Sequence, residues 1–178
     1  PIPSRGLGDV YKRQSPLFSV VVPNAIRGDK LAREESFWSG KMNQSVIAKD
    51  LNLVDDATII GGRSSGSRDD EGVPTRLNQL IDSGKLVGSL WSTRDAAQQI
   101  AEGRIDSAKT TGSAIRSGHQ SPPISGCSNL FLTSSNKSYD MDGLLQEMNE
   151  GYVVNSVMGA HTANPTSGDF SVTTSSIL

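Results

Sequence analysis

The sequence predicts an α+β domain built largely of antiparallel β-sheet with a few short helices. Short β-branched runs recur along its 178 residues, and glycine, proline and aspartate, which favour turns, separate them. Apolar residues with helical spacing are confined to a few short stretches. Because no stretch approaches the roughly 18 consecutive apolar residues that span a membrane, we expect a soluble, cytoplasmic protein with no membrane partner.

The first half of the chain predicts strands, one helix and one long loop. Residues 17–22 are apolar, β-branched and closed by a proline, which indicates a buried strand. Residues 29–38 predict a helix capped by its first residue, an aspartate. Apolar residues between 46 and 54 predict one or two strands leading to the turn signal Asp55-Asp56. Residues 61–72 are rich in glycine and nearly without apolar side chains, so they predict a loop.

The clearest local signal is a β-hairpin. Residues 75–81 and 85–91 are strand-like runs, and Asp82-Ser83-Gly84 between them supplies a tight turn with a position for positive φ. After the hairpin we expect a helix over 94–102, capped by the preceding threonine and ended by Gly103.

The last third alternates loops with short elements. Residues 106–128 are polar and contain several glycines and prolines, which predicts a long loop. A strand over 129–132 and a helix over 141–150 follow, the helix being capped by the preceding aspartate. The β-branched run 152–157 predicts another strand, and residues 164–178 predict a turn followed by an alternating strand.

Charge and cysteine content exclude several classes of protein. The chain has 17 basic and 19 acidic residues and a formal net charge of −2. A nucleic-acid binder held by a basic face needs clustered lysine and arginine, so we expect no nucleic-acid partner. Cys127 is the single cysteine, which excludes an intramolecular disulfide framework and a zinc site built from cysteines.

The two ends of the chain differ from its middle in composition and sequence pattern. Residues 1–14 are basic and aperiodic and resemble translated library-adapter sequence, so we expect them to lie outside the fold. The chain stops inside a serine- and threonine-rich strand pattern. We therefore expect residues 15–178 to be a truncated domain, an internal piece of a longer protein.

One cluster of carboxylates is a candidate site. The segment Arg68-Asp69-Asp70-Glu71-Gly72, called the acidic run below, concentrates three carboxylates that could bind a cation or act as acid and base. It also has the composition of an acidic turn in a solvated loop. Spacing alone favours the turn, because it matches no cation-binding motif.

The remaining reactive side chains show no catalytic arrangement. His119 and His161 lie far apart in loops, and a metal site needs three or four convergent ligands, so incidental or structural roles are favoured. Cys127 has no histidine nearby in the sequence, which disfavours a nucleophile.

Four segments, in this order, resemble the C-terminal domain of the TldD/PmbA peptidases, also called the modulator of DNA gyrase family. They are LVDDATIIGG at 53–62, SRDDEGVPTRLNQLIDSGKLVGSL at 67–90, SPPISGCSNLFL at 121–132 and GYVVNSVMGAHTANPTSGDFS at 151–171. The Asp-Asp-Glu-Gly-Val-Pro run, which ends at Pro74, is specific to this resemblance. The resemblance covers nearly everything from about residue 19 onward, and it implies that the family's N-terminal domain and final C-terminal portion are missing.

The resemblance also indicates the type of subunit. In this family the TldD type carries a His-Glu-x-x-x-His metal motif and a later cysteine ligand, whereas the PmbA type, also called TldE, lacks them and pairs with TldD. Arg27-Gly28-Asp29 resembles the Gly-Asp that follows the motif, and counting back places Ser19, Val20 and Asn24 at the motif's histidine, glutamate and second histidine. These side chains cannot replace zinc ligands or a general base. Cys127 lies too early to be the family's cysteine ligand.

The implied function is that of a PmbA/TldE-type subunit without catalytic or metal-binding residues of its own. It would bind no cofactor, form a heterodimer with a TldD-type partner in which zinc is expected, and support proteolysis of small or unfolded peptides by that partner. The residues of this chain that match family motifs are candidates for contact with peptide or with the partner. They are Arg68, Asp69, Asp70, Glu71, Gly72, Pro74, Asn164, Gly168 and Asp169.

Two other functions stay open from the sequence. A stand-alone peptidase with displaced ligands could use His119, His161 or the carboxylates between Asp69 and Glu71. A non-enzymatic regulator is suggested by the gyrase-modulator name of the family.

Overall fold

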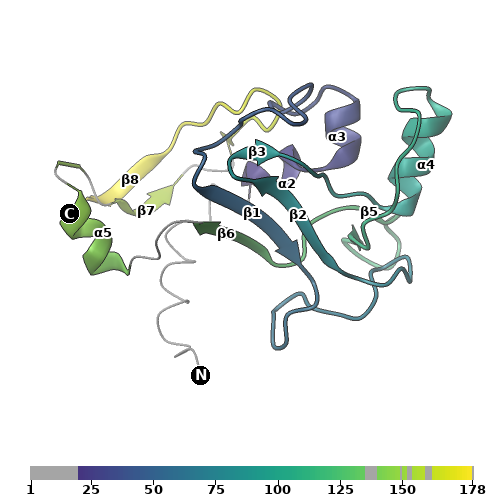
Figure 1. The fold of residues 1–178 in the computed structure, drawn as a ribbon. Coiled ribbons are helices and arrows are strands. Elements are labelled where there is room, and N and C mark those ends of the chain that lie inside the picture. Colours follow the sequence, from purple (N-terminus) through teal and green to yellow (C-terminus); the bar gives the residue numbers. More distant parts are fainter. Residues whose placement is uncertain (1–19, 135–139, 149, 152–153, 159–161, 178) are drawn as a thin grey trace.

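The computed structural model describes residues 20–134, 140–148, 150–151, 154–158 and 162–177. Its centre is a four-stranded antiparallel sheet with the strand order β3-β2-β1-β6 (Figure 1). The strands are β1 (Leu51–Asp56), β2 (Leu77–Asp82), β3 (Lys85–Leu86) and β6 (Leu130–Ser134). The predicted α+β class with antiparallel pairing is confirmed.

The hairpin between β2 and β3 turns where the sequence predicts. Ser83 and Gly84 both have positive φ, 48° and 77°, which is the conformation of a two-residue hairpin turn that follows the twist of the strands. An ideal Cβ on Gly84 would lie 2.7 Å from the carbonyl oxygen of Ile47. Glycine is therefore required here by both backbone conformation and space. Strand β3 is shorter than the predicted run over 85–91.

The core lies between this sheet and the first described helix, α2 (Val22–Ala25). Side chains from α2, β1, β2 and β3 meet in one buried cluster. Its members are Ala25, Ile26, Trp38, Leu53, Leu80, Ile81, Leu86 and Leu90.

The strand expected over 17–22 is wrong where the structure describes it. Residues 20–22 have helical or turn backbone and lead into α2, with the amide of Ala25 donating to the carbonyl of Val21 at 3.2 Å. Pro23 stands in the first turn, where its missing N–H is not needed and its fixed φ suits a helix. A short apolar run is ambiguous between a buried strand and a buried helix, and here the helix forms. Residues 17–19 lie outside the described part.

Helix α3 (Gly28–Ala32) is shorter than the predicted 29–38. Its N-cap is Arg27, so the expected cap, Asp29, instead lies in the first turn. Glu34 has φ of 60°, a left-handed conformation that no longer continues the helix.

Helix α4 (Thr93–Ala101) agrees with the prediction except for its cap, which is Ser92 instead of Thr93. Gly103 adopts the left-handed conformation expected after the helix, with φ of 67°. Figure 1 shows α3 and α4 as neighbours at one end of the sheet. The side-chain oxygen of the buried Gln99 on α4 accepts from Arg33 Nε at 3.2 Å and from Nη2 at 3.1 Å, in the amide orientation that satisfies both groups.

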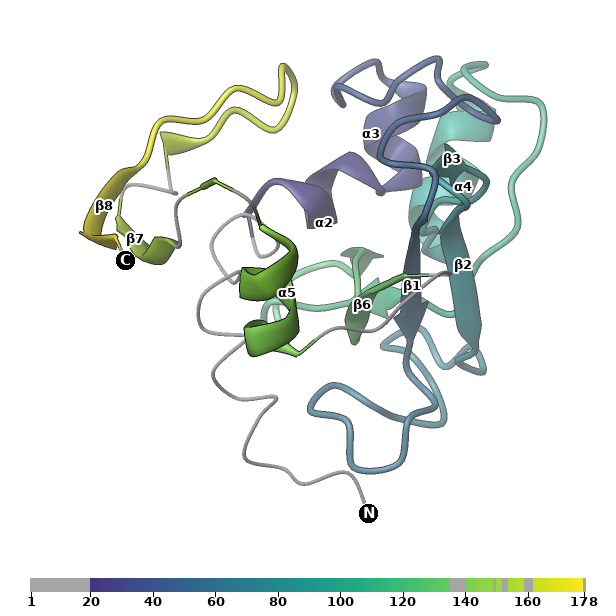
Figure 2. The ribbon, with the colours of Figure 1, turned by 60° about the vertical axis from the view of Figure 1, so that its left-hand side comes forward.

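The rest of the chain forms small elements beside the sheet. Strands β4 (Ala114–Ile115) and β5 (Ile124–Ser125) pair inside the segment expected to be a loop. Helix α5 (Met141–Glu147) begins at the predicted cap, and β7 (Val154–Met158) pairs with β8 (Thr173–Ile177). Figure 2 shows α5 and the β7–β8 hairpin lying to one side of the central sheet. None of the helices formed by the described residues is long and apolar enough to cross a membrane.

Candidate functional site

The positions that resemble the metal motif lie within helix α2 and just before it. Val20 and Asn24 are one helical turn apart, and Asn24 Nδ2 donates to the Val20 carbonyl at 3.0 Å. The side-chain amide of Asn24 is therefore hydrogen-bonded within its own helical turn, and Val20, one turn before it, is aliphatic. Neither residue fits a zinc site, which needs imidazole, thiolate or carboxylate ligands. Ser19, the third position, lies outside the described residues.

The Arg27-Gly28-Asp29 segment fixes the start of α3 against the chain that follows the hairpin. Arg27 donates to Asp29 through Nε at 2.9 Å and Nη2 at 2.8 Å, a bidentate pair with little exposure. The amide of Gly28 donates to the carbonyl of Leu90 at 2.9 Å. An ideal Cβ on Gly28 would lie 1.9 Å from Cε2 of Trp91, so only glycine allows this approach.

The acidic run closes on itself through its first carboxylate. Asp69 Oδ1 accepts from the amides of Glu71 at 3.0 Å and Val73 at 2.9 Å. The amide of Asp69 donates in return to the carbonyl of Val73 at 2.9 Å. One carboxylate oxygen is therefore saturated by the turn that carries it.

Arg68 ties the two ends of the same turn together. Its Nη1 donates to the carbonyl of Gly72 at 2.6 Å, and its backbone pairs with that of Pro74. Gly72 has φ of 81°, a left-handed conformation that glycine adopts without steric cost.

The two aspartates also hold the segment around β4. Asp69 Oδ2 accepts from the amide of Ala114 at 3.0 Å, and Asp70 Oδ2 accepts from the amide of Arg116 at 2.7 Å. The amide of Asp70 donates to the carbonyl of Ala114 at 3.1 Å. The acidic run therefore pairs with β4 much as a further strand would, but through side chains as well as backbone.

Glu71 caps helix α4 from outside the helix. Its Oε2 accepts from the amide of Thr93 at 2.6 Å and its Oε1 from the amide of Arg94 at 3.0 Å. Ser92 Oγ accepts from the amide of Asp95 at 3.0 Å. The amides at the start of a helix have no partner within it, and here two carboxylate oxygens and one hydroxyl satisfy the first three.

Strand β5 is attached to the same helix end. The amide of Ser92 donates to Ser125 Oγ at 2.8 Å. Asp95, which is buried, accepts at Oδ2 from the amide of Ser125 at 2.7 Å and from its hydroxyl at 2.8 Å. Asp95 is a structural residue that the sequence analysis did not single out.

All three carboxylates of the acidic run thus accept backbone amides of this chain. Among the described residues, no group of three or more histidine, cysteine, aspartate or glutamate side chains is placed to hold a metal ion. The geometry is that of a brace joining three segments that are far apart in the sequence. Contact of these residues with peptide or with a partner stays a prediction.

The Asn164–Asp169 loop forms a separate turn. Asn164 Oδ1 accepts from the amide of Thr166 at 2.9 Å, and the amide of Asn164 donates to the carbonyl of Asp169 at 2.8 Å. Gly168 has φ of 80°, and an ideal Cβ on it would lie 3.0 Å from Cγ of Phe37. The loop is therefore seated against the residues that follow α3, and the acidic run is not brought together with it.

Asp55 is a buried carboxylate that was interpreted as part of a turn. It lies within β1 with 1% exposure, and its Oδ1 accepts from the amide of Ser128 at 2.7 Å and from its hydroxyl at 3.1 Å. Burial raises the pKa of Asp55 to about 6, although the two donors of Ser128 act in the opposite direction. The spacing of two residues from the buried Leu53 was the signal that could have placed Asp55 on the inner face.

The other reactive side chains are not assembled into a site. His119 is exposed in a loop, and His161 lies outside the described residues. Burial, together with the charge of Asp55, raises the pKa of the Cys127 thiol to about 11, which opposes formation of a nucleophilic thiolate.

Comparison with known proteins gives one consistent result. The PmbA/TldA metallopeptidase C-terminal domain matches residues 14–178. The chain is 29% identical over 159 residues to the metalloprotease TldD homologue of Haemophilus influenzae, covering 89% of this chain and 31% of that protein.

Two solved structures share the fold. TldE from Thermococcus kodakarensis superposes with a TM-score of 0.78 and 28% identity, over 92% of this chain and 35% of that one. A candidate modulator of a DNA gyrase from Thermotoga maritima superposes with a TM-score of 0.71 and 27% identity, over 92% and 34%. The chain spans about a third of the length of these relatives.

Proposed function

The chain belongs to the PmbA/TldD family of metallopeptidases, within its C-terminal domain, and we propose that it is part of the PmbA-type subunit, the one without a metal site. In this role it supports hydrolysis of small or unfolded peptides by a zinc-bearing TldD-type partner. Overall similarity does not separate the two types, since the chain is 29% identical to a TldD homologue and 28% identical to a TldE.

The observation that carries the proposal is the chemistry of the motif positions. Val20 stands where the motif has glutamate, and Asn24, whose amide donates to the carbonyl one turn back, stands where it has histidine. An aliphatic side chain cannot accept a proton from water, and an amide is a poor zinc ligand. A peptidase reaction involving this subunit therefore needs its base and its metal from a partner.

The contacts of the acidic run also support a structural role for this subunit. Its carboxylates accept from the amides of residues 93, 94, 114 and 116, so each already has a structural role. We assign them to holding the loops of this subunit in a fixed shape. A rigid wall beside a partner's active site needs such bracing, because loops that present a surface have to be held by the scaffold beneath them.

The test uses the full-length protein that contains this chain and the TldD-type protein of the same organism. Each is incubated alone, and then both together, with an unstructured peptide, with and without a zinc chelator. The proposal predicts cleavage only by the mixture, lost on chelation and lost when the partner's motif glutamate is replaced by glutamine. That glutamine variant is the matched control, because it keeps the assembly and removes the base.

Each alternative function predicts a different result, one in this assay and one in a co-purification experiment. Chelator-sensitive cleavage by the chain-containing protein alone contradicts the proposal and supports a peptidase with displaced ligands. Co-purification with gyrase, but not with the TldD-type protein, supports the non-enzymatic regulator suggested by the likeness to a candidate gyrase modulator.

A further inference from the structure

Asp55 is held differently from the two other buried aspartates. Asp29 forms a bidentate pair with Arg27, and Asp95 has Arg94 Nη1 at 3.7 Å. The donors to Asp55 are instead neutral, namely the amide of Ser128 at 2.7 Å and its hydroxyl, which lies 3.1 and 3.2 Å from the two carboxylate oxygens. A buried carboxylate is costly when charged unless a cation compensates it, so its protonation state matters for the structure around it.

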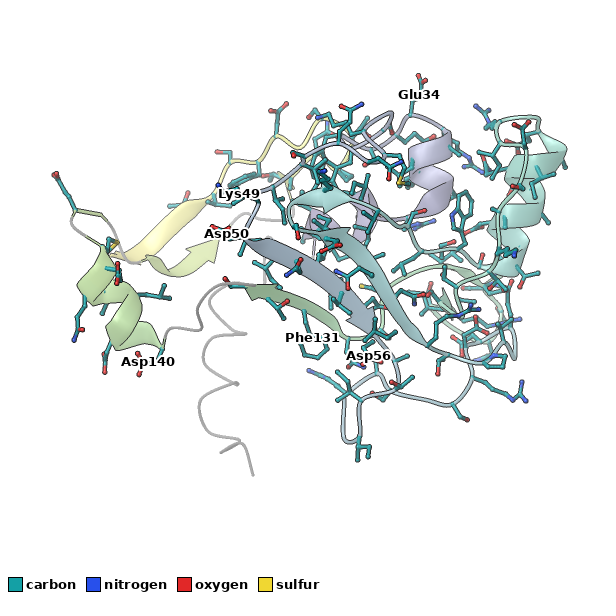
Figure 3. The ribbon with its side chains drawn as sticks, viewed as in Figure 1. Glu34, Lys49, Asp50, Asp56, Phe131 and Asp140 are labelled. Carbon is teal, nitrogen blue, oxygen red and sulfur yellow. The ribbon has the colours of Figure 1, made fainter. Side chains whose placement is uncertain are left out.

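The segment held by Asp55 joins two strands. Residues 126–129, called the junction below, connect the end of β5 to the start of β6. Asn129 of the junction donates through Nδ2 to the carbonyl of Asp56 and to Ser65 Oγ, both at 2.9 Å. Its Oδ1 accepts from the amide of Ser64 at 3.1 Å. The junction therefore attaches the 57–66 loop to β1 as well, at the end of the strand marked by Asp56 in Figure 3.

We propose that Asp55 is a proton-controlled latch: protonated, it holds the junction closed against β1, and ionised, it favours opening of the junction and release of the 57–66 loop. A charged carboxylate gains solvation when the junction opens, whereas a neutral one does not. The direction is fixed by this difference, because burial disfavours the charged form more strongly than the donors of Ser128 favour it.

None of the charged or titratable neighbours of Asp55 named below favours its ionisation. Asp56 on the same strand adds a like charge that further opposes ionisation of Asp55, and Cys127 in the junction is a neutral thiol. The residues paired with Asp55 on the adjacent strands are Asn78 on β2 and Leu130 on β6, neither of which carries a charge. No cation among these neighbours offsets the cost of the ionised form.

The pH range of the latch follows from the pKa of Asp55 in the two states. The pKa is about 6 in the closed state, where burial raises it, and returns to its ordinary value of 3.8 when the junction opens. The open state binds fewer protons between these values, so opening becomes more favourable as pH rises and levels off above the closed-state pKa. Between pH 5 and pH 7 the opening equilibrium increases about tenfold.

Cys127 reports on opening because it is the single cysteine of the chain, lies within the junction and is partly buried against the core. The experiment measures its labelling by 4,4′-dithiodipyridine between pH 5 and pH 8 in the 178-residue chain. Each rate is divided by that of the same chain unfolded in urea, which removes the intrinsic pH dependence of the thiol. Asp55→Asn is the matched variant, since it keeps the shape and an acceptor oxygen but cannot ionise.

The expected result is a normalised rate that rises about tenfold from pH 5 to pH 7 in the wild type and stays level in Asp55→Asn. Hydrogen exchange of the amides of β2 is measured in parallel. If the opening free energy obtained from Cys127 labelling equals the one obtained from these core amides, the opening is global and the latch is refuted.

Equal pH profiles of Cys127 labelling in the wild type and in Asp55→Asn would also refute the latch. If Asp55→Asn does not fold, Ser128→Ala replaces it. This variant keeps the amide donor and removes the hydroxyl, which stabilises the charged closed state less, so the rise must continue to higher pH than in the wild type. An unchanged midpoint in Ser128→Ala then overturns the proposal.

Discussion

Replacing Glu71 tests whether the acidic run is a brace. Glu71→Ala removes both carboxylate oxygens that accept from the amides of Thr93 and Arg94, at 2.6 and 3.0 Å. Loss of a capping side chain costs about 0.5–2 kcal/mol, and loss of a negative charge at a helix N-terminus adds about 0.3–1 kcal/mol. Water reaches these partly exposed amides and replaces some of the loss. We expect the free energy of unfolding to fall by about 2 kcal/mol, or a melting temperature lower by about 4–8 °C.

The assay is urea unfolding followed by circular dichroism, with Glu71→Gln and Glu150→Ala measured beside Glu71→Ala. Glu71→Gln keeps one acceptor oxygen and loses the charge, so it should be destabilised by about half as much. Glu150 is exposed and away from helix α4, so Glu150→Ala should stay within about 0.5 kcal/mol of the wild type. A Glu71→Ala chain as stable as the Glu150→Ala control would show that the brace contributes nothing, and the structural assignment of the acidic run would be withdrawn.

Three further predictions concern packing and protonation. Gly28→Ala should lower the free energy of unfolding by about 2–3 kcal/mol, because the new methyl group overlaps the ring of Trp91. The double variant Gly28→Ala, Trp91→Leu should lose less stability than the sum of the two single variants. The contribution of Asp55 to the stability of the wild type should fall by about 2 kcal/mol as pH rises from 4 to 7, since the folded-state pKa of Asp55 is raised to about 6, and Asp55→Asn should remove this contribution in urea unfolding. Gly168→Ala should cost about 1–2 kcal/mol, because its φ is 80° and its ideal Cβ lies 3.0 Å from the ring of Phe37, and hydrogen exchange should show the 164–169 turn opening more often.

The elements predicted correctly are those whose signals are local. The hairpin at 82–84 depends on a short turn with a glycine for positive φ, which the sequence shows, whereas the positive φ of Ser83 was not predicted. Helix α4 and the left-handed Gly103 follow from spacing and capping residues within one segment. For such elements, the information that fixes the conformation lies within about ten residues.

The segments that were predicted wrongly depend on contacts between residues far apart in the sequence. Residues 20–22 have strand-like composition, yet they have helical or turn backbone and lead into α2, where Ala25 and the following Ile26 pack into the core against the sheet. Asp55-Asp56 has turn composition, yet it completes a strand because Ser128 satisfies its buried carboxylate from 73 residues away. The composition of each segment alone does not show the residues that it contacts in the fold.

The hydrogen-bond partners of the acidic run could not be predicted from the sequence. The sequence identified the acidic run as a unit, but the run's partners, the amides at 93, 94, 114 and 116, are supplied by the fold. Backbone amides carry no sequence signature, so no motif could have named them. The placement of Val20 and Asn24 at the metal motif stays a prediction from the resemblance, and if it is right, their residue types alone exclude zinc ligands and a general base.

Zinc content tests the central claim most directly. The full-length protein containing this chain, purified without its partner and without chelator, is analysed by native mass spectrometry after equilibration with zinc, beside the TldD-type protein treated identically. We expect a metal-free mass for the former and stoichiometric zinc in the latter, because the proposed alignment places Val20 and Asn24 at the glutamate and histidine of the motif. Stoichiometric zinc in the isolated chain-containing protein would contradict it.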